Sequence, residues 1–140
     1  KTNGIPSRMT DPVAVIPPQM AALERDWQMS PGIISNGHVF LTGFNGCPLD
    51  GPPSPDPETQ IATAFDAVEL VLHEAGLGFE SVVDMTSYHV GLADHLSLFR
   101  RMRTARISRP YPAWTAIEVA GFATPGVIVE LKVVARLNND

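Results

Sequence analysis

The segment from residue 127 to residue 134 places the strongest constraint on how this chain can fold. Apolar residues occupy both of its alternating sets of positions: Val127, Val129, Leu131 and Val133 in one set, Ile128 and Val134 in the other. Successive side chains of a strand point to opposite faces of a sheet, so a strand with this composition suits burial on both faces. The segment therefore predicts a sheet whose second face is covered, and an oligomer is one way to cover it.

One carboxylate interrupts this apolar strand. Glu130 lies among Val, Ile and Leu residues, where an ionised side chain is costly if it is buried. Either Glu130 points to water from one face of the sheet, or it lies in a pocket and takes part in chemistry. The residues themselves leave both possibilities open.

The first half of the chain contains clear signals for a hairpin and for loops. Two apolar runs, residues 33–35 and 38–42, are separated by Asn36-Gly37, which is the strongest short-range hairpin signal. Residues 45–56 are too rich in proline for regular structure and predict a surface loop. Residues 1–26 contain four prolines and predict an irregular arm, with a short helical turn at residues 19–25.

The second half predicts two helices and three strands. Asp56 and Pro57 suit the N-cap and first position of a helix whose apolar residues recur every three or four positions to Ala75, and Gly76 suits its end. A strand is expected over residues 82–90. Asp94 is the expected cap of a second helix over residues 95–107, and the two C-terminal strands follow.

The order of these elements is β-β-α-β-α-β-β, which predicts an α+β fold with two helices packed on one face of a mixed β-sheet. At 140 residues the chain is long enough for one domain. We expect the irregular arm over residues 1–26 and a single domain over residues 27–140.

Composition limits the classes of function. The net charge of −5 argues against binding nucleic acid by phosphate neutralisation. The chain has one cysteine, which suits a reducing cytoplasm. No apolar run is long enough for a membrane span, and no signal peptide is expected. The four histidines lack metal-ligand spacing, so no metal and no cofactor are expected.

The chain resembles the Rid proteins, the YjgF-type reactive intermediate deaminases, over residues 27–137. The resemblance is carried by short segments in a shared order: residues 37–43, 59–77, 81–86, 92–96 and 112–120, and the apolar strand containing Glu130. It implies a chorismate-mutase-like fold and a homotrimer that binds a small molecule in clefts between subunits.

The resemblance also implies which residues form the cleft. Glu130 matches a glutamate thought to position the attacking water. Thr42 and Thr115 match hydroxyl positions of the family and are either ligand contacts or ordinary strand threonines, and backbone groups near Gly43 could add contacts. Trp114 stands where the family's deaminases have the arginine that binds the substrate carboxylate, and an indole carries no charge. Trp114 is either a wall of the cleft or an ordinary buried aromatic residue.

Phe99 has the same two interpretations, since many family members have asparagine at its position. Trp27 is the nearest aromatic residue to a family tyrosine. The arginines at 100, 101, 103, 106 and 109 form either a solvated helix face or an anion- or RNA-binding patch.

Two functions follow as hypotheses. The first is an enzyme that hydrolyses a small imine, enamine or related electrophile, with Glu130 as the catalytic group, but that differs from the typical 2-imino-acid deaminase because of Trp114. The second is a catalytically silent small-molecule binding protein on the same fold.

Overall fold

The computed structural model describes residues 11–138. It contains one mixed sheet in the strand order β1-β2-β3-β7-β5-β6, with β4 also paired to β7. The strands are β1 (Val13–Val15), β2 (Gly32–Ser35), β3 (His38–Leu41), β4 (Phe44–Asn45), β5 (Val82–His89), β6 (Ala113–Glu118) and β7 (Val129–Arg136). The helical elements are η1 (Pro18–Met20), α2 (Ala21–Trp27), α3 (Pro57–Glu74), η2 (Phe79–Ser81) and α4 (Leu92–Arg106).

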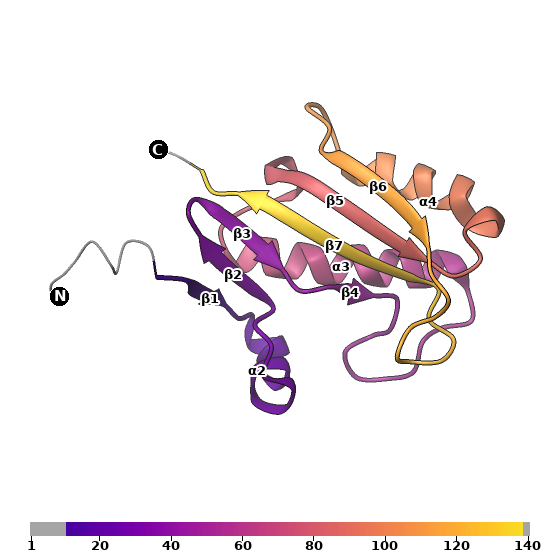
Figure 1. The fold of residues 1–140 in the computed structure, drawn as a ribbon, viewed down its shortest axis with the longest axis horizontal. Helices are drawn as coiled ribbons and strands as arrows, with labels where there is room; N and C mark the ends of the chain where they lie inside the picture. Colours follow the sequence, from indigo (N-terminus) through magenta and orange to yellow (C-terminus); the bar gives the residue numbers. More distant parts are fainter. Residues whose placement is uncertain (1–10, 139–140) are drawn as a thin grey trace, which may run out of the picture.

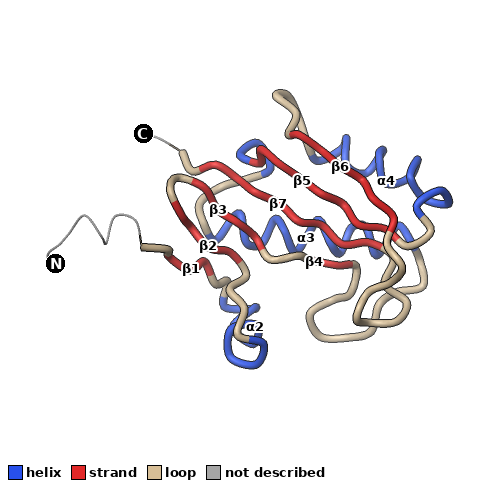
Figure 2. Tube along the Cα trace, in the orientation of Figure 1, coloured by secondary structure: helices blue, strands red, loops and turns tan. Residues whose placement is uncertain are grey.

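The long helices α3 and α4 lie on the same face of the sheet (Figures 1 and 2). The predicted α+β architecture is therefore confirmed. The mixed character of the sheet comes from β5 and β6, which are parallel because α4 crosses between them, while the remaining strand pairs are antiparallel. No helix in residues 11–138 is long and apolar enough to cross a membrane.

The hairpin between β2 and β3 forms as predicted. Asn36 and Gly37 both have positive φ, at 50° and 80°, as a two-residue hairpin turn with the correct twist requires. The hairpin register pairs Ser35 with His38. This turn fixes β3 beside the C-terminal half of β7.

Helix α3 also begins and ends where the sequence predicts. The Asp56 carboxylate accepts a hydrogen bond from the Thr59 N–H at 3.1 Å, and Gly76 adopts a φ of 76° after the last turn. One buried residue was not expected: Gln60 is 1% exposed. Its amide nitrogen donates to the carbonyl oxygens of Ser54 and Gly126, both at 2.8 Å, and its amide oxygen accepts from the Ile128 N–H at 2.9 Å.

Two sequence predictions need correction. Asp94 is not the cap of the second helix, because Gly91 adopts a left-handed conformation (φ 72°) and starts α4 at Leu92, which places Asp94 inside the first turn. The N-terminal arm is less irregular than predicted. Val13–Val15 add a strand to the edge of β2, and α2 covers the helical turn that the sequence indicated. Residues 1–10 lie outside the described part.

The two faces of the sheet differ in their cover. On the face under the helices, Val129, Leu131 and Val133 of β7 are fully buried against the core that includes Phe65 and Phe99. The opposite face, called the open face below, carries apolar side chains that remain exposed: Phe40 (41%), Val83 (39%) and Ile117 (46%).

Candidate functional site

Glu130 lies on the open face near the start of β7. Its cross-strand partners are Asn45 of β4 and Tyr88 of β5, and its side chain rests against Gly43. A Cβ atom at residue 43 would lie 3.0 Å from Glu130 Cδ and closer still to Oε2, so the carboxylate takes the space that a side chain at Gly43 would need. The break between β3 and β4 therefore holds the carboxylate in place.

The surroundings of Glu130 favour its protonated form. Burial raises the pKa of its carboxyl group, and the charge of Lys132 offsets this only in part. The Lys132 ammonium donates a hydrogen bond to the Leu41 carbonyl oxygen, which holds it near β3. Within residues 11–138 the Glu130 carboxylate has no ion-pair partner within 4.0 Å. A half-buried carboxyl group with a raised pKa is a stronger proton acceptor than an exposed glutamate and can exchange protons with a ligand.

Thr42 and Gly43 border a groove of about 770 Å³ between the sheet edge, α2 and α3. The Thr42 hydroxyl donates to the Met29 sulfur at 3.3 Å. Trp27, which is 71% exposed, contributes to the same groove. The weak sequence match of Trp27 to a family tyrosine therefore coincides with a position beside Thr42 and Gly43.

Trp114 lies on the other side of the sheet, where β6 packs against α4. Its ring centroid is 5.8 Å from that of Phe99, and the Arg103 guanidinium carbon lies 4.3 Å from the centre of its ring. Its indole N–H donates to the Ser87 hydroxyl at 2.9 Å. Phe99 itself is fully buried, so within one chain it supports Trp114 from the core.

A chain of buried polar groups continues inward from Trp114. Ser87 Oγ lies 2.8 Å from His89 Nε2, and His89 Nδ1 lies 3.1 Å from His95 Nε2. An indole N–H can only donate, so the Ser87 hydroxyl oxygen accepts from Trp114. The Ser87 hydroxyl then donates its own proton to His89 Nε2, and His89 Nδ1–H donates to His95 Nε2. Burial, with the neighbouring His95, lowers the pKa of His89 to about 4, so His89 is neutral at pH 7.

The residues proposed from the sequence thus form two groups within one chain. Glu130, Thr42 and Gly43 lie together. Thr115 is exposed on the same open face, where its cross-strand neighbour is Thr86 of β5, and Thr86 in turn pairs with Lys132 of β7. Trp114 and Phe99 contact each other on the helix-covered face. A single chain does not bring the two groups into one cavity, and their assignment as a shared site stays a prediction.

Sequence reasoning missed several side chains around these groups. Ser87, His95 and Asn45 carried no recognisable signal, because each depends on a cross-strand or strand-to-helix neighbour. Arg103 was seen only as a member of a basic cluster. Its spacing of four residues from Phe99 and eight from the buried His95 places it on the inward stripe of α4, and this signal was available.

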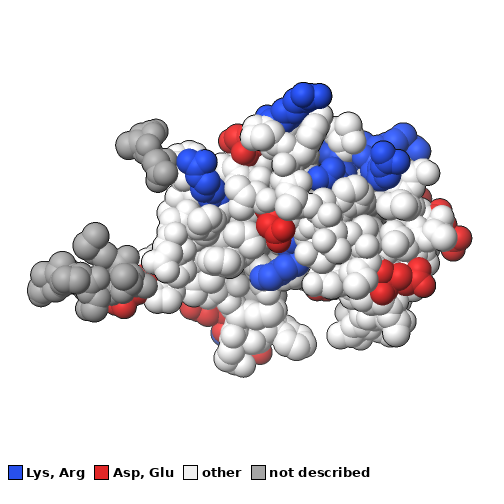
Figure 3. Space-filling model, turned by 45° about the horizontal axis from the view of Figure 1, so that its top comes forward, with Lys and Arg blue, Asp and Glu red and all other residues white. Residues whose placement is uncertain are grey.

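The other arginines have ordinary partners or lie in solvent. Arg106 pairs with Asp66 at 2.8 Å and approaches Glu69 at 3.8 Å, while Arg100 and Arg101 are exposed. Basic side chains gather along the margin of the molecule where α4 and β6 lie (Figure 3). This distribution keeps both interpretations of the basic cluster open.

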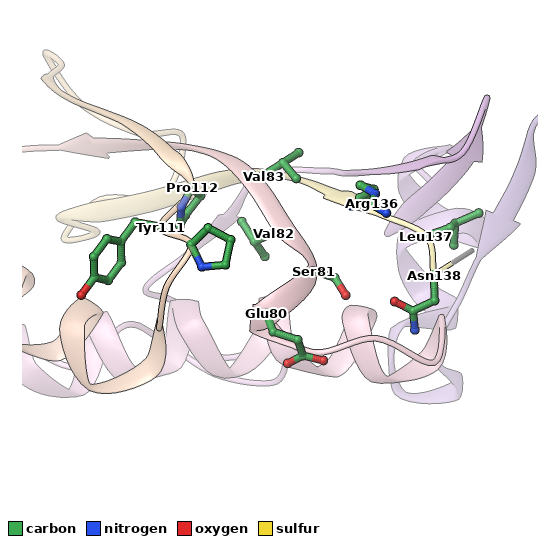
Figure 4. A pocket seen from close by; sticks show the side chains of 10 residues that line it. Glu80, Ser81, Val82, Val83, Tyr111, Pro112, Arg136, Leu137 and Asn138 are labelled. Carbon is green, nitrogen blue, oxygen red and sulfur yellow. The ribbon is translucent and has the colours of Figure 1, made fainter. Parts of the chain in front are cut away.

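Two further features lie away from Glu130. A hollow of about 500 Å³ is lined by three parts of the chain: the segment with Tyr111 and Pro112, the start of β5, and the end of β7 (Figure 4). The Cys47 thiol donates to the Gly51 carbonyl oxygen at 3.1 Å inside the proline-rich loop. In the part of the chain that the structure describes, no three His, Cys, Asp or Glu residues cluster as a metal site would need.

Comparison with known proteins gives consistent matches over nearly the whole chain. The family model described as "Endoribonuclease L-PSP" matches residues 19–137. The RutC family protein YjgH of Escherichia coli (strain K12) is 33% identical over 130 residues, which cover 92% of this chain and 98% of that protein.

Solved structures agree with this assignment. A structure of protein YJGH has a TM-score of 0.81 at 32% identity and covers 91% of this chain and 98% of its own. Rv2704 from Mycobacterium tuberculosis, described as a member of the YjgF/YER057c/UK114 family, has a TM-score of 0.76 at 18% identity and covers 91% and 100%, which supports the fold alone. The chain belongs to the YjgF/Rid family.

Proposed function

We propose that this protein hydrolyses a small imine, enamine or related electrophile, with Glu130 as the group that activates water. The observation that carries the proposal is the half-buried Glu130 carboxyl group, which is held against Gly43 and has a raised pKa. Its carboxylate accepts a proton from water as the water oxygen bonds to the C=N carbon. The carboxyl proton then passes to nitrogen, which gives a carbinolamine. Transfer of its hydroxyl proton to the same nitrogen, through Glu130, accompanies the break of the C–N bond and gives a carbonyl compound and an amine or ammonia.

The proposed site lies between copies of the chain in a homotrimer. Two observations support this arrangement. Glu130 with Gly43 and Trp114 with Phe99 lie on opposite faces of one sheet, so only two different copies can place both groups in one cleft. The open face also exposes the apolar side chains of Phe40, Val83 and Ile117, which contact with a neighbouring copy would bury.

The substrate of this reaction differs from a short 2-imino acid. In such a molecule the carboxylate is bonded directly to the C=N carbon, and the family's deaminases are expected to hold it with an arginine at the position of Trp114. Trp114 offers one N–H, and that donor is already bonded to Ser87. We therefore expect slow turnover of 2-iminobutanoate and 2-iminopropanoate.

A second function, ligand binding without turnover, also fits the site. The groove beside Thr42 is large enough for a small molecule, and the replacement of arginine by Trp114 removes one group of the family's reaction. Either function suits a cytoplasmic location, in which the single cysteine, Cys47, stays reduced.

One pair of measurements tests the proposal. Ammonia or amine release from a panel of short imines generated in solution is measured with the unmodified protein, with Glu130→Gln and without protein. Under the enzymatic proposal Glu130→Gln slows turnover about 100-fold or more, because it removes the proton acceptor. Equal rates for the two proteins on every imine, with ligand binding retained, would support the silent binding protein instead.

Sedimentation tests the trimer separately. The unmodified protein should sediment at about three times the 15.1 kDa of one chain. Ile117→Lys, which places a charge on the open face, should sediment as a smaller species. A monomeric unmodified protein at micromolar concentration would contradict the intersubunit cleft.

A further inference from the structure

Arg103 occupies an unusual position for an arginine. It projects from α4 onto the indole ring of Trp114, with its guanidinium carbon 4.3 Å from the ring centre. Its Nε atom is shielded from solvent and has no hydrogen-bond partner within residues 11–138. Burial lowers the pKa of its guanidinium group, which means that the protein bears a cost for keeping a charge there.

No carboxylate of the described residues compensates that charge. Among residues 11–138, no ion pair within 4.0 Å involves Arg103. Asp66 and Glu69 of α3 are engaged by Arg106, one turn further along α4. The Glu118 carboxylate accepts a hydrogen bond from the Leu92 N–H at 3.0 Å. Buried donors in folded proteins almost always have partners, so the free Arg103 donor indicates a missing acceptor.

The stacked arrangement also decides what Trp114 can offer to a ligand. Arg103 covers one side of the indole ring, Phe99 packs near it from the core, and the indole N–H is bonded to Ser87. An uncovered aromatic face would suit a neutral or cationic ligand. The group over the Trp114 ring is instead the Arg103 guanidinium, a planar cation with several N–H donors.

We propose that Arg103, supported by Trp114, forms a binding site for a carboxylate or similar planar anion at the edge of β6. The two terminal N–H groups of a guanidinium together match the two oxygens of a carboxylate. The indole ring holds the guanidinium plane in place, so little side-chain freedom is lost when the anion binds.

The position of Arg103 narrows the class of ligand. Arg103 belongs to α4 and not to β6, so an anion bound to it is held from the helix rather than from the strand position of the family's arginine, and it need not be attached to the C=N carbon. This fits a carboxylate that is separated from the reacting carbon by two or more bonds. The inference deepens the proposed function and rests on it for the reacting carbon, while the anion site itself is measured by binding.

The test uses the two tryptophans of the chain as reporters. In a ¹H–¹⁵N spectrum the indole N–H of Trp114 reports on the site, and that of Trp27 reports separately on binding in the groove beside Thr42. The probes are 4-oxopentanoate, its neutral amide 4-oxopentanamide, and 2-oxobutanoate. They are titrated at constant ionic strength into the unmodified protein, Arg103→Gln, Arg103→Lys and the control Arg101→Gln, which changes an exposed arginine of the same helix.

We expect 4-oxopentanoate to shift the Trp114 signal and to bind about tenfold or more tightly than the amide and than 2-oxobutanoate. Arg103→Gln should remove this preference, Arg103→Lys should keep part of it, and Arg101→Gln should keep all of it. Equal binding of acid and amide, no binding of the acid, unchanged binding by Arg103→Gln, or equally tight 2-oxobutanoate would each overturn the inference. Because no turnover is measured, a failure here is distinct from a failure of Glu130 catalysis.

Discussion

The buried histidine pair makes the stability of this protein depend on pH in a calculable way. His89 is fully buried, and its pKa falls from 6.5 to about 4 through burial and the neighbouring His95. Below pH 6.5 the unfolded chain binds a proton at this residue, whereas the folded chain binds it only near pH 4. Stability therefore falls as the pH drops from 6.5 to 4, and His89 causes no loss at pH 7.

The size of the effect follows from the two pKa values. At pH 4.5 the unfolded imidazole is almost fully protonated and the folded one is mostly neutral, which lowers the free energy of unfolding by about 2.5 kcal/mol. In a variant without this imidazole the loss disappears, and the remaining pH dependence belongs to the other groups.

Urea denaturation at several pH values between 7.5 and 4.5 measures this. The unmodified protein is compared with His89→Gln, which keeps polar atoms in the pocket, and with His73→Gln, which changes an exposed histidine of α3. Relative to its own value at pH 7.5, the unmodified protein should lose about 2 to 3 kcal/mol more than His89→Gln by pH 4.5. His73→Gln should follow the unmodified protein. Parallel curves for the unmodified protein and His89→Gln would refute the burial argument.

Two further predictions concern the frame of the site. Gln60→Glu should lower the free energy of unfolding by about 3 kcal/mol or more, because two backbone carbonyls would face a carboxylate. In the same urea denaturation assay, the control Gln19→Glu, at an exposed position, should change the free energy of unfolding by less than about 0.5 kcal/mol. Gly43→Ala should push the Glu130 carboxylate from its place and slow imine turnover about tenfold or more, whereas Gly121→Ala, where a Cβ meets nothing within 4 Å, should match the unmodified rate. Unchanged stability in the first case, or unchanged turnover in the second, would contradict the geometry described above.

The local signals in the sequence predicted most of the fold. Asn36-Gly37 and Asp56-Pro57 act through their own backbone preferences and through neighbours a few residues away, so a reader of the sequence can find them. Asp94 was wrongly taken as a cap because Gly91, three residues earlier, provided a left-handed turn that starts the helix sooner. Strand β1 was missed because a three-residue strand depends on the edge it joins.

The candidate site could be predicted only in part. Glu130 stands out in sequence because it breaks an apolar run. The family resemblance implied that Glu130 and Gly43 share a cleft, whereas their contact is seen only in the structure. The relation between Trp114 and Arg103 could not be read in the same way, since it needs the crossing of β6 and α4. Within one chain neither residue meets Glu130, and the proposed meeting in a neighbouring copy is a relation that no single sequence describes.

The Gln60 side chain has a consequence for how this protein ages chemically. It joins three chain segments, the proline-rich loop, the turn at Gly126 and the approach to β7, using both of its amide N–H groups and its oxygen. Loss of that amide by deamidation changes one nitrogen to oxygen and barely alters size. It nevertheless turns both donations into repulsions, one at Ser54 and one at Gly126, which lies three residues before the strand that carries Glu130. Slow damage during storage would therefore loosen the site before it unfolds the domain.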